Sequence, residues 1–368
     1  MKARQEVFGS DGSWYKSISD LAKAIGCSKC HLSQALKDKG RAERYGVLYT
    51  LDEPKSKVAP TMNKKEQAEF DEFKEAKKVE NLPFKRFDFA DNGKRGSSRY
   101  AVALFSDAHI EETVDPGSVL GLNEYNVEIA KQRVERYFIN LGLCIEADEV
   151  EHLVFASLGD TISGFIHDEL AQSNGLTPLE ATLLAQNLIY SGLEYLCNNT
   201  RLKDIRFVGI VGNHSRTTKK IQHSNGYRMS YEWMMYKNIE RECKATKLPI
   251  EFCLPESEMA LLDMEDGNRF IFIHGFQLKS SGTGTVCGIY PALNRLCMKW
   301  DRTFKQTRVF LGHFHSCISL PNAMVNGSII GFNSFALSNG FSYEEPAQMY
   351  CVYDPIIGEL LTRKIYCK

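Results

Sequence analysis

Residues 100–107, YAVALFSD, decide the fold of the larger part of this chain, because a short apolar run ends there in an aspartate. Four later stretches repeat the pattern of an apolar run with a polar end: HLVFASLGD (152–160), IRFVGIVGNH (205–214), RFIFIHG (269–275) and RVFLGHFH (308–315). Runs of this length are typical of strands buried on both faces. They predict five strands in the interior of an α/β protein.

Amphipathic segments separate these runs. Residues 124–146 place apolar side chains on one helical face, and residues 179–198 and 227–245 predict two further helices. Strands with helices between them predict a layered α/β fold. The tail from Met349, MYCVYDP followed by LLTRKIYC, predicts two strands paired as a hairpin.

Each apolar run ends in residues that can bind a metal ion: Asp107 and His109, Asp160, Asn213 and His214, His274, and His313 and His315. Loops at strand ends are where such folds place their sites. One histidine there is usually structural or solvated, but five successive strands with the same feature indicate a site. Oxygen and imidazole donors without cysteine favour Mn, Fe, Zn or a similar ion over a thiolate zinc site. Two ions can be held if one carboxylate bridges them.

In this order, the motifs Asp-Ala-His (107–109), Gly-Asp (159–160), Gly-Asn-His (212–214), His-Gly (274–275) and Gly-His-Phe-His (312–315) resemble the signature of the calcineurin-like metallophosphoesterases. The resemblance covers about two-thirds of the chain. Each motif alone is weak, whereas all five in this order are strong. The resemblance implies a layered α-β-β-α sandwich and a metal-dependent phosphoesterase activity.

The resemblance also implies roles for individual residues. Asp107, His109 and His315 would hold one ion, and Asn213, His274 and His313 the other. Asp160 would bridge the two ions. His214 would lie beside them as a proton donor to the leaving oxygen. Mn²⁺ is favoured, with Fe, Zn, Ni or Mg as alternatives.

The segment after the Asn-His pair departs from the family pattern. The family often has an acidic residue there that can orient the histidine, whereas this chain has Ser215 and Arg216. Another carboxylate must orient His214, with Asp107 as one possibility, or none does. Ser215 stands where the family often has the acidic residue, and it either has a role in the site or is only a turn residue. Arg216 is predicted to grip a phosphate, with an ordinary surface arginine as the alternative.

Three further segments flank the motifs. The loop SRTTKKIQHSNGYR (215–228) is basic and is either a contact for a polyphosphate backbone or a solvated loop. The segment QLKSSGTGTVCG (277–288) lacks the spacing of a nucleotide-binding P-loop and is interpreted as a mobile substrate loop. His167, Asp168 and Glu169 are interpreted as part of the rim of the site.

Residues 1–52 predict a small helical, helix-turn-helix-like module, residues 53–99 a charged linker, and residues 100–368 the catalytic domain. Two short helices are separated by Gly26, and Ser17 and Ser28 are available as caps. A strand is possible at 45–51. In a helix-turn-helix the second helix would offer DNA its polar side chains: Lys29, His31, Gln34 and Lys37. The alternative is a docking or oligomerisation module.

The net charge of −1 excludes a generally basic nucleic-acid-binding surface. The sequence has no apolar run long enough to span a bilayer and no signal-peptide core at its start, so the expected location is the cytoplasm. The leading hypothesis is a two-metal phosphodiesterase, in particular a DNA nuclease. A phosphomonoesterase or a phosphodiesterase of small or cyclic nucleotides is the second. A DNA-binding protein with an inert phosphoesterase scaffold is the third.

Overall fold

The computed structural model of this chain describes residues 7–9, 14–39, 41–44, 47–50, 99–166, 170–278 and 286–368. The chain divides into two compact units, residues 1–91 and 92–368, which are treated separately below. All of the predicted linker except residue 99 lies outside the described residues, as do the predicted rim residues 167–169 and residues 279–285 of the predicted substrate loop. Among the described helices, none is both long and apolar enough to cross a membrane.

The N-terminal unit has the two predicted helices, α1 (Ile18–Ala24) and α2 (Lys29–Lys39). Ser17 caps α1 by accepting the amide of Asp20 at 3.2 Å. The expectation of a helical module with one possible strand at 45–51 was incomplete, because a four-stranded antiparallel sheet accompanies the helices: β1 (Val7–Gly9), β2 (Trp14–Tyr15), β3 (Arg41–Arg44) and β4 (Val47–Thr50), of which β4 lies at the possible strand. Leu21 and Leu36 pack against Val7 and Tyr49, so helices and sheet share one small core.

The C-terminal unit is built on a six-stranded sheet of order β15-β14-β5-β6-β7-β8. Four strands are parallel: β5 (Arg99–Phe105), β6 (Val150–Ser157), β7 (Asp204–Gly209) and β8 (Ile250–Cys253). The predicted C-terminal hairpin is present as β14 (Ala347–Asp354) and β15 (Gly358–Tyr366), and β14 pairs antiparallel with β5.

A second sheet has five strands in the order β12-β13-β11-β10-β9. Its parallel centre consists of β10 (Arg269–Ile273), β11 (Arg308–Leu311) and β13 (Ala323–Val325). The edges are β9 (Met259–Asp263) and β12 (Ile318–Leu320), both antiparallel to their neighbours. Of the five predicted interior strands, three therefore lie in the first sheet and two in the second.

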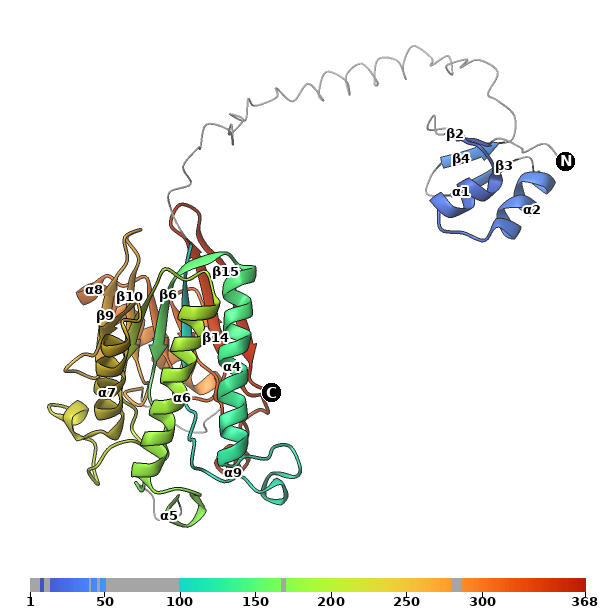
Figure 1. Ribbon diagram of the computed structural model, residues 1–368. Coiled ribbons are helices and arrows are strands. Elements are labelled where there is room, and N and C mark those ends of the chain that lie inside the picture. Colours follow the sequence, from blue (N-terminus) through green and yellow to red (C-terminus); the bar gives the residue numbers. More distant parts are fainter. Residues whose placement is uncertain are drawn as a thin grey trace. The chain divides into compact units, whose positions relative to one another are not determined.

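Helices cover the outer face of each sheet (Figure 1). The long helices α4 (Val127–Ala147), α6 (Pro178–Asn199) and α7 (Tyr231–Thr246) pack on the six-stranded sheet. The helix α8 (Val286–Phe304) packs on the five-stranded sheet. A third apolar cluster, which includes Val102, Phe272 and Phe310, lies between the two sheets. These layers confirm the predicted α-β-β-α sandwich.

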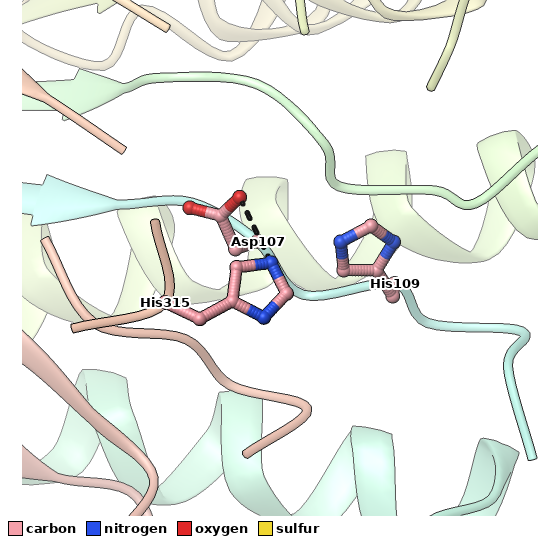
Figure 2. Close-up of side chains that lie close together, drawn as sticks. All are labelled: Asp107, His109 and His315. Carbon is pink, nitrogen blue, oxygen red and sulfur yellow. Dashed lines mark ion pairs between the residues drawn. The ribbon is translucent and has the colours of Figure 1, made fainter. Parts of the chain in front are cut away.

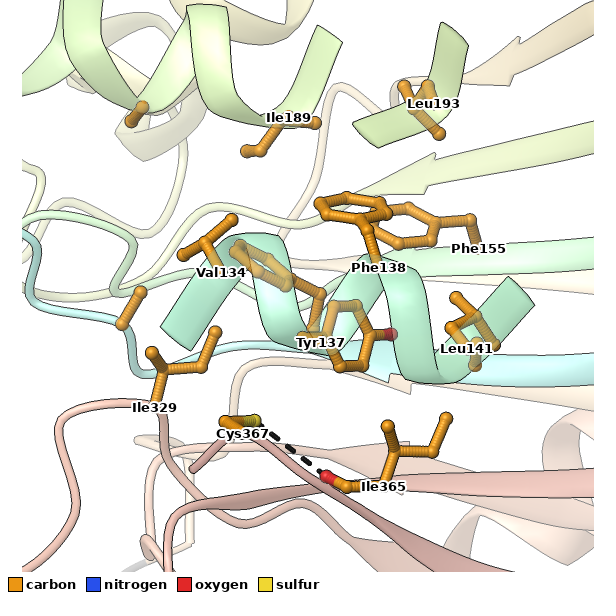
Figure 3. Packing of buried hydrophobic residues seen from close by; sticks show 14 of the residues in the cluster. Val134, Tyr137, Phe138, Leu141, Phe155, Ile189, Leu193, Ile329, Ile365 and Cys367 are labelled. Atoms are coloured by element: carbon orange, nitrogen blue, oxygen red, sulfur yellow. Dashed lines mark hydrogen bonds between the residues drawn. The ribbon is translucent and has the colours of Figure 1, made fainter. Parts of the chain in front are cut away.

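The core beneath α4 shows why the predicted helical face is apolar. Tyr137, Phe138 and Leu141 point from α4 toward the sheet and α6, where Phe155 of β6 stacks on Phe138 with ring centroids 5.5 Å apart (Figure 3). A Cβ atom at Gly192 of α6 would collide with the Phe138 ring, so glycine lets the two helices approach closely. Burial of such large side chains stabilises the packing of these helices on the sheet that carries the site.

Smaller elements complete the unit: the 3-10 helices η1 (Pro116–Val119) and η2 (Gly226–Met229) and the short helices α5 (Leu170–Ser173) and α9 (Ser334–Ser338). The predicted helices at 124–146 and 179–198 agree with α4 and α6 to within three residues. The helix predicted from residue 227 begins only at Tyr231, because Ser230 caps it by accepting the amide of Glu232.

Candidate metal centre

The structure gathers the strand-end residues at one edge of the sandwich. Because β5, β6 and β7 run parallel, their carboxyl ends meet at the same edge of the first sheet. The strands β10 and β11 end beside it in the second sheet. The residues that follow these five strands are Asp107 and His109, Asp160, Asn213 and His214, His274, and His313 and His315.

The backbone at this edge is strained. Nine described residues other than glycine have a positive φ, and five of them are predicted ligands: Asp107 (53°), His109 (47°), Asp160 (51°), His313 (72°) and His315 (52°). This left-handed region is uncommon for residues with a Cβ and costs about 1–3 kcal/mol per residue. Such residues cluster at functional sites, so the strain indicates a site independently of the side-chain chemistry.

Glycines allow the loops to approach one another. A Cβ atom at Gly212 would collide with the Asp160 carboxylate, and one at Gly312 would lie 2.6 Å from Asp107 Oδ2. Backbone bonds then tie the loops together, since the Asp107 amide donates to Gly159 at 3.0 Å. The glycines beside the predicted ligands therefore allow the loops to lie close together.

The first group of donors consists of Asp107, His109 and His315, whose ligand atoms all lie within 4.8 Å of one another (Figure 2). His315 Nε2 lies 3.4 Å from Asp107 Oδ1. Asp107 and His109 are buried, and His315 is partly buried. The three side chains form a compact, largely water-excluded set of one oxygen and two nitrogen donors.

The second group consists of Asp160, His274 and His313, which meet the same distance criterion. His274 Nε2 lies 2.9 Å from Asp160 Oδ2 and 3.1 Å from Asn213 Oδ1, so Asn213 joins this group. The rings of His274 and His313 are 5.0 Å apart between centroids. These groups match the two ligand sets that the family resemblance implies. The bridging role of Asp160 stays a prediction.

Backbone contacts orient the ligand rings. His274 Nδ1 lies 2.6 Å from the carbonyl oxygen of Leu158, which can only accept a hydrogen bond. Nδ1 therefore carries a proton, and Nε2 is the ring nitrogen that faces Asp160 and Asn213. That nitrogen is the one a metal ion would need.

The electrostatics of the site suit ion binding. Burial, together with the charge of His214, lowers the pKa of His109 to about 3, and burial with the charge of His274 lowers the pKa of His313 to about 4. Both rings are therefore neutral near neutral pH and can donate lone pairs. Burial opposes a charge on His274, but the Asp160 carboxylate raises the pKa of that ring to about 9, so an ion would have to displace the proton on Nε2 in order to bind there. Burial favours a neutral Asp160, yet the surrounding histidines hold its pKa well below the usual range.

His214 lies beside both groups. Its amide donates to Asp160 Oδ1 at 2.8 Å, and its ring meets the His109 ring edge-on with centroids 4.9 Å apart. Its Nδ1 lies 3.2 Å from the backbone carbonyl oxygen of Ser163. A backbone carbonyl thus contacts this ring, where the sequence left open either a carboxylate or no orienting partner.

A buried polar network behind Asp107 could not be seen in the sequence. Ser106 donates from its hydroxyl to Asp107 Oδ2 at 2.5 Å. Asn326 donates to the Ser106 hydroxyl at 2.8 Å and to Gln348 Oε1 at 2.7 Å. All of these side chains are fully buried, so the network holds the Asp107 carboxylate in one orientation.

Glu232, at the start of α7, is a second residue that sequence reasoning missed. Its carboxylate accepts the amides of Thr161 at 2.6 Å and Gly212 at 2.7 Å, and the Ser215 hydroxyl at 2.7 Å. Burial and the Asp160 charge raise the pKa of Glu232, while these three donors oppose the shift. Glu232 therefore joins the loop that carries Asp160 to the loop that carries Asn213 and His214.

Arg216 donates to the backbone carbonyls of Asn213, Thr218 and Lys219 in its own loop. Its binding to phosphate stays a prediction. In the rest of the basic loop, Lys219 and Lys220 are exposed, whereas His223 and Arg228 lie 2.8 Å and 3.8 Å from glutamates.

The predicted DNA-binding residues Lys29, His31, Gln34 and Lys37 all belong to α2. The Lys29 and Gln34 side chains are exposed. Contact with DNA stays a prediction for all four.

The residues present fit two divalent ions. Each group brings one buried carboxylate together with two imidazoles, and Asn213 adds an amide oxygen to the second group. Such oxygen and nitrogen donors suit Mn, Fe or Zn. The strained backbone and the hydrogen-bonded ring of His274 show that the protein holds these donors in defined positions.

The sequence matches no family profile and no curated protein. Solved structures that align with it include a single mutant of Vps29 from Entamoeba histolytica, at 11% identity over 72% of this chain and 97% of that one, with a TM-score of 0.31. A 5'-nucleotidase from Candida albicans aligns at 11% identity over 69% and 48%, with a TM-score of 0.32. The calcineurin-like phosphoesterase YfkN from Bacillus subtilis aligns at 10% identity over 70% and 85%, with a TM-score of 0.28. Likenesses this distant carry no argument about function, which rests on the residues of the site.

Proposed function

We propose that this protein is a two-metal-dependent phosphoesterase that hydrolyses phosphodiester bonds, and that its substrate is DNA. The observation that carries the proposal is the pair of adjacent donor groups, Asp107 with His109 and His315 and Asp160 with His274 and His313, at one edge of the sandwich. A single structural ion would need only one such group. The family resemblance of the five motifs supports the same reaction.

When bound by Asp107, His109 and His315 and by Asp160, His274 and His313, two ions would supply positive charge for the phosphate oxygens and would activate a water molecule. The protein's own residues hold the donors for those ions in a fixed, buried geometry, so little reorganisation is needed during the reaction. His214 would give a proton to the leaving oxygen from Nε2, because its Nδ1 faces the Ser163 carbonyl oxygen. Mn²⁺ is the expected ion.

Two features support a nucleic-acid substrate. The N-terminal unit contains two short helices joined by a tight turn, the arrangement that places a helix in a DNA groove. The loop after His214 offers Lys219 and Lys220 as exposed positive charges near the donor groups in sequence. Together they favour a nuclease over a hydrolase of small nucleotides.

A substrate panel with added Mn²⁺ tests the proposal. It should include single- and double-stranded DNA, RNA, cyclic dinucleotides, p-nitrophenyl phosphate and bis(p-nitrophenyl) phosphate. We expect hydrolysis of DNA and of the aryl diester, both lost on chelation and in His313→Ala. His152→Ala is the matched control, because His152 lies at the other end of β6 from Asp160. Activity on the monoester or on cyclic dinucleotides alone would refute the nuclease assignment.

A further inference from the structure

Ser163 is a fully buried polar residue that the proposed reaction does not use. It lies in the loop after β6, three positions beyond Asp160. Its hydroxyl, its carbonyl and its amide each contact a different part of the site. Through these contacts Ser163 joins a predicted ligand, the predicted proton donor and two carboxylates.

The Ser163 hydroxyl lies between a carboxylate and a ligand histidine. It donates to Glu112 Oε2 at 3.1 Å, and His109 Nδ1 lies 2.9 Å from the same oxygen. A carboxylate can only accept, so the hydroxyl proton points to Glu112 and the hydroxyl oxygen accepts from His109. His109 then carries its proton on Nδ1 and keeps the Nε2 lone pair for the group that it forms with Asp107 and His315.

The Ser163 carbonyl acts in the same way on His214. It lies 3.2 Å from His214 Nδ1 and can only accept, so that nitrogen holds a proton. The proton for a leaving oxygen must then come from Nε2. Because the rings of His109 and His214 meet edge-on, a shift of this one residue would disturb both.

A buried carboxylate also binds the backbone amides of this loop. Glu111 accepts the amides of Ser163 at 2.9 Å and Gly164 at 2.8 Å. Gly164 has a φ of +59°, and a Cβ atom there would lie 2.7 Å from the His214 carbonyl oxygen. The loop can therefore adopt this position against His214 only with glycine after Ser163.

We propose that Ser163 is a positioning residue that sets the protonated nitrogen of His109 through its hydroxyl and that of His214 through its carbonyl. This inference rests on the proposed function for its consequence in catalysis. One loop residue thereby couples the orientation of a metal ligand to that of the proton donor. Removal of a comparable outer partner of a ligand histidine typically costs about 10–100-fold in metal affinity or activity.

Ser163→Ala separates the two contacts, because it removes the hydroxyl and keeps the carbonyl. In the metal-free full-length protein, ¹⁵N-histidine NMR should show His109 protonated on Nδ1 in the wild type and a mixture of tautomers in the variant. Mn²⁺ titration should show one site weakened by about 10–100-fold. The ratio of activity on DNA to activity on bis(p-nitrophenyl) phosphate should stay unchanged, since the His214 contact remains.

Ser157→Ala is the matched control, because it removes a buried hydroxyl that contacts Tyr236 and no histidine of the site. Glu112→Gln provides a second test with a side chain of the same size. The glutamine amide can donate to the Ser163 oxygen, which frees the Ser163 hydroxyl proton to point toward His109 Nδ1. This variant should therefore also weaken one Mn²⁺ site. An unchanged His109 tautomer and unchanged Mn²⁺ affinity in both variants would overturn the inference. Failure of the wild type to hydrolyse any phosphoester would refute the proposed function, while the tautomer measurement would still decide the role of Ser163.

Discussion

His214→Ala should separate proton donation from metal binding. A positioned general acid is typically worth about 10²–10⁴-fold, or about 3–5 kcal/mol of barrier at 1.36 kcal/mol per tenfold. The contact of His214 with Asp160 is made by the backbone amide, which alanine keeps, so both donor groups should stay intact. The loss should be near this full range for DNA, whose leaving alkoxide is basic. It should be clearly smaller for bis(p-nitrophenyl) phosphate, because nitrophenolate leaves without a proton.

The assay compares initial rates on the two substrates at saturating Mn²⁺, with metal content measured on the same samples. His313→Ala is the contrasting variant, since loss of a ligand should reduce both rates together. His152→Ala should change neither rate. Equal losses on both substrates in His214→Ala, with full metal occupancy, would refute proton donation and would indicate that His214 positions the phosphate.

Two further predictions concern the rest of the molecule. Removal of residues 1–52 should weaken DNA binding in a salt-dependent manner. It should spare hydrolysis of the aryl diester, because the donor groups lie beyond residue 99. Equal DNA affinity of the truncated and full-length proteins would contradict the helix-turn-helix assignment. Glu232→Ala should lower the free energy of unfolding by about 2–6 kcal/mol, at about 1–3 kcal/mol for each of the two buried amides left unpaired, and Glu232→Gln by less. Glu240→Ala on the same helix, whose partners are lysines, is the control in urea denaturation, and equal effects of the two alanine variants would show that Glu232 does not join the loops.

The sequence predicted a layered α/β fold and donor residues at the strand ends because both depend on local patterns. The α-β-β-α arrangement and the division of the donors into two groups were implied by the family resemblance. An apolar run followed by Asp or His is visible in YAVALFSDAH itself, and parallel strands bring such ends to one edge. The strands β8, β9, β12 and β13 and the helix α8 were not predicted. In the N-terminal sheet only β4 was indicated, as a possible strand at 45–51, because strands of two to four residues are too short to show a clear period.

The contacts that orient the site could not be predicted, because their partners are distant in the chain or have no side-chain signature. Glu232 lies in the first turn of a helix, where acidic residues are common, and it meets the Thr161 amide across 71 positions. The partner of His214 Nδ1 is a backbone carbonyl, which any residue at position 163 would offer. The left-handed backbone of five predicted ligand residues likewise appears only in three dimensions.

The metal content of the protein tests the central claim most directly. The purified chain should be dialysed against Mn²⁺ at saturating concentration and subjected to elemental analysis, with Asp160→Asn measured in parallel and Asp204→Asn, at the opposite end of the sheet, as the control. The two donor groups predict two ions per chain in the wild type and in Asp204→Asn. If the Asp160 carboxylate bridges the ions as predicted, Asp160→Asn should weaken binding at both sites. One ion or fewer per chain in the wild type at saturation would contradict the two-metal account.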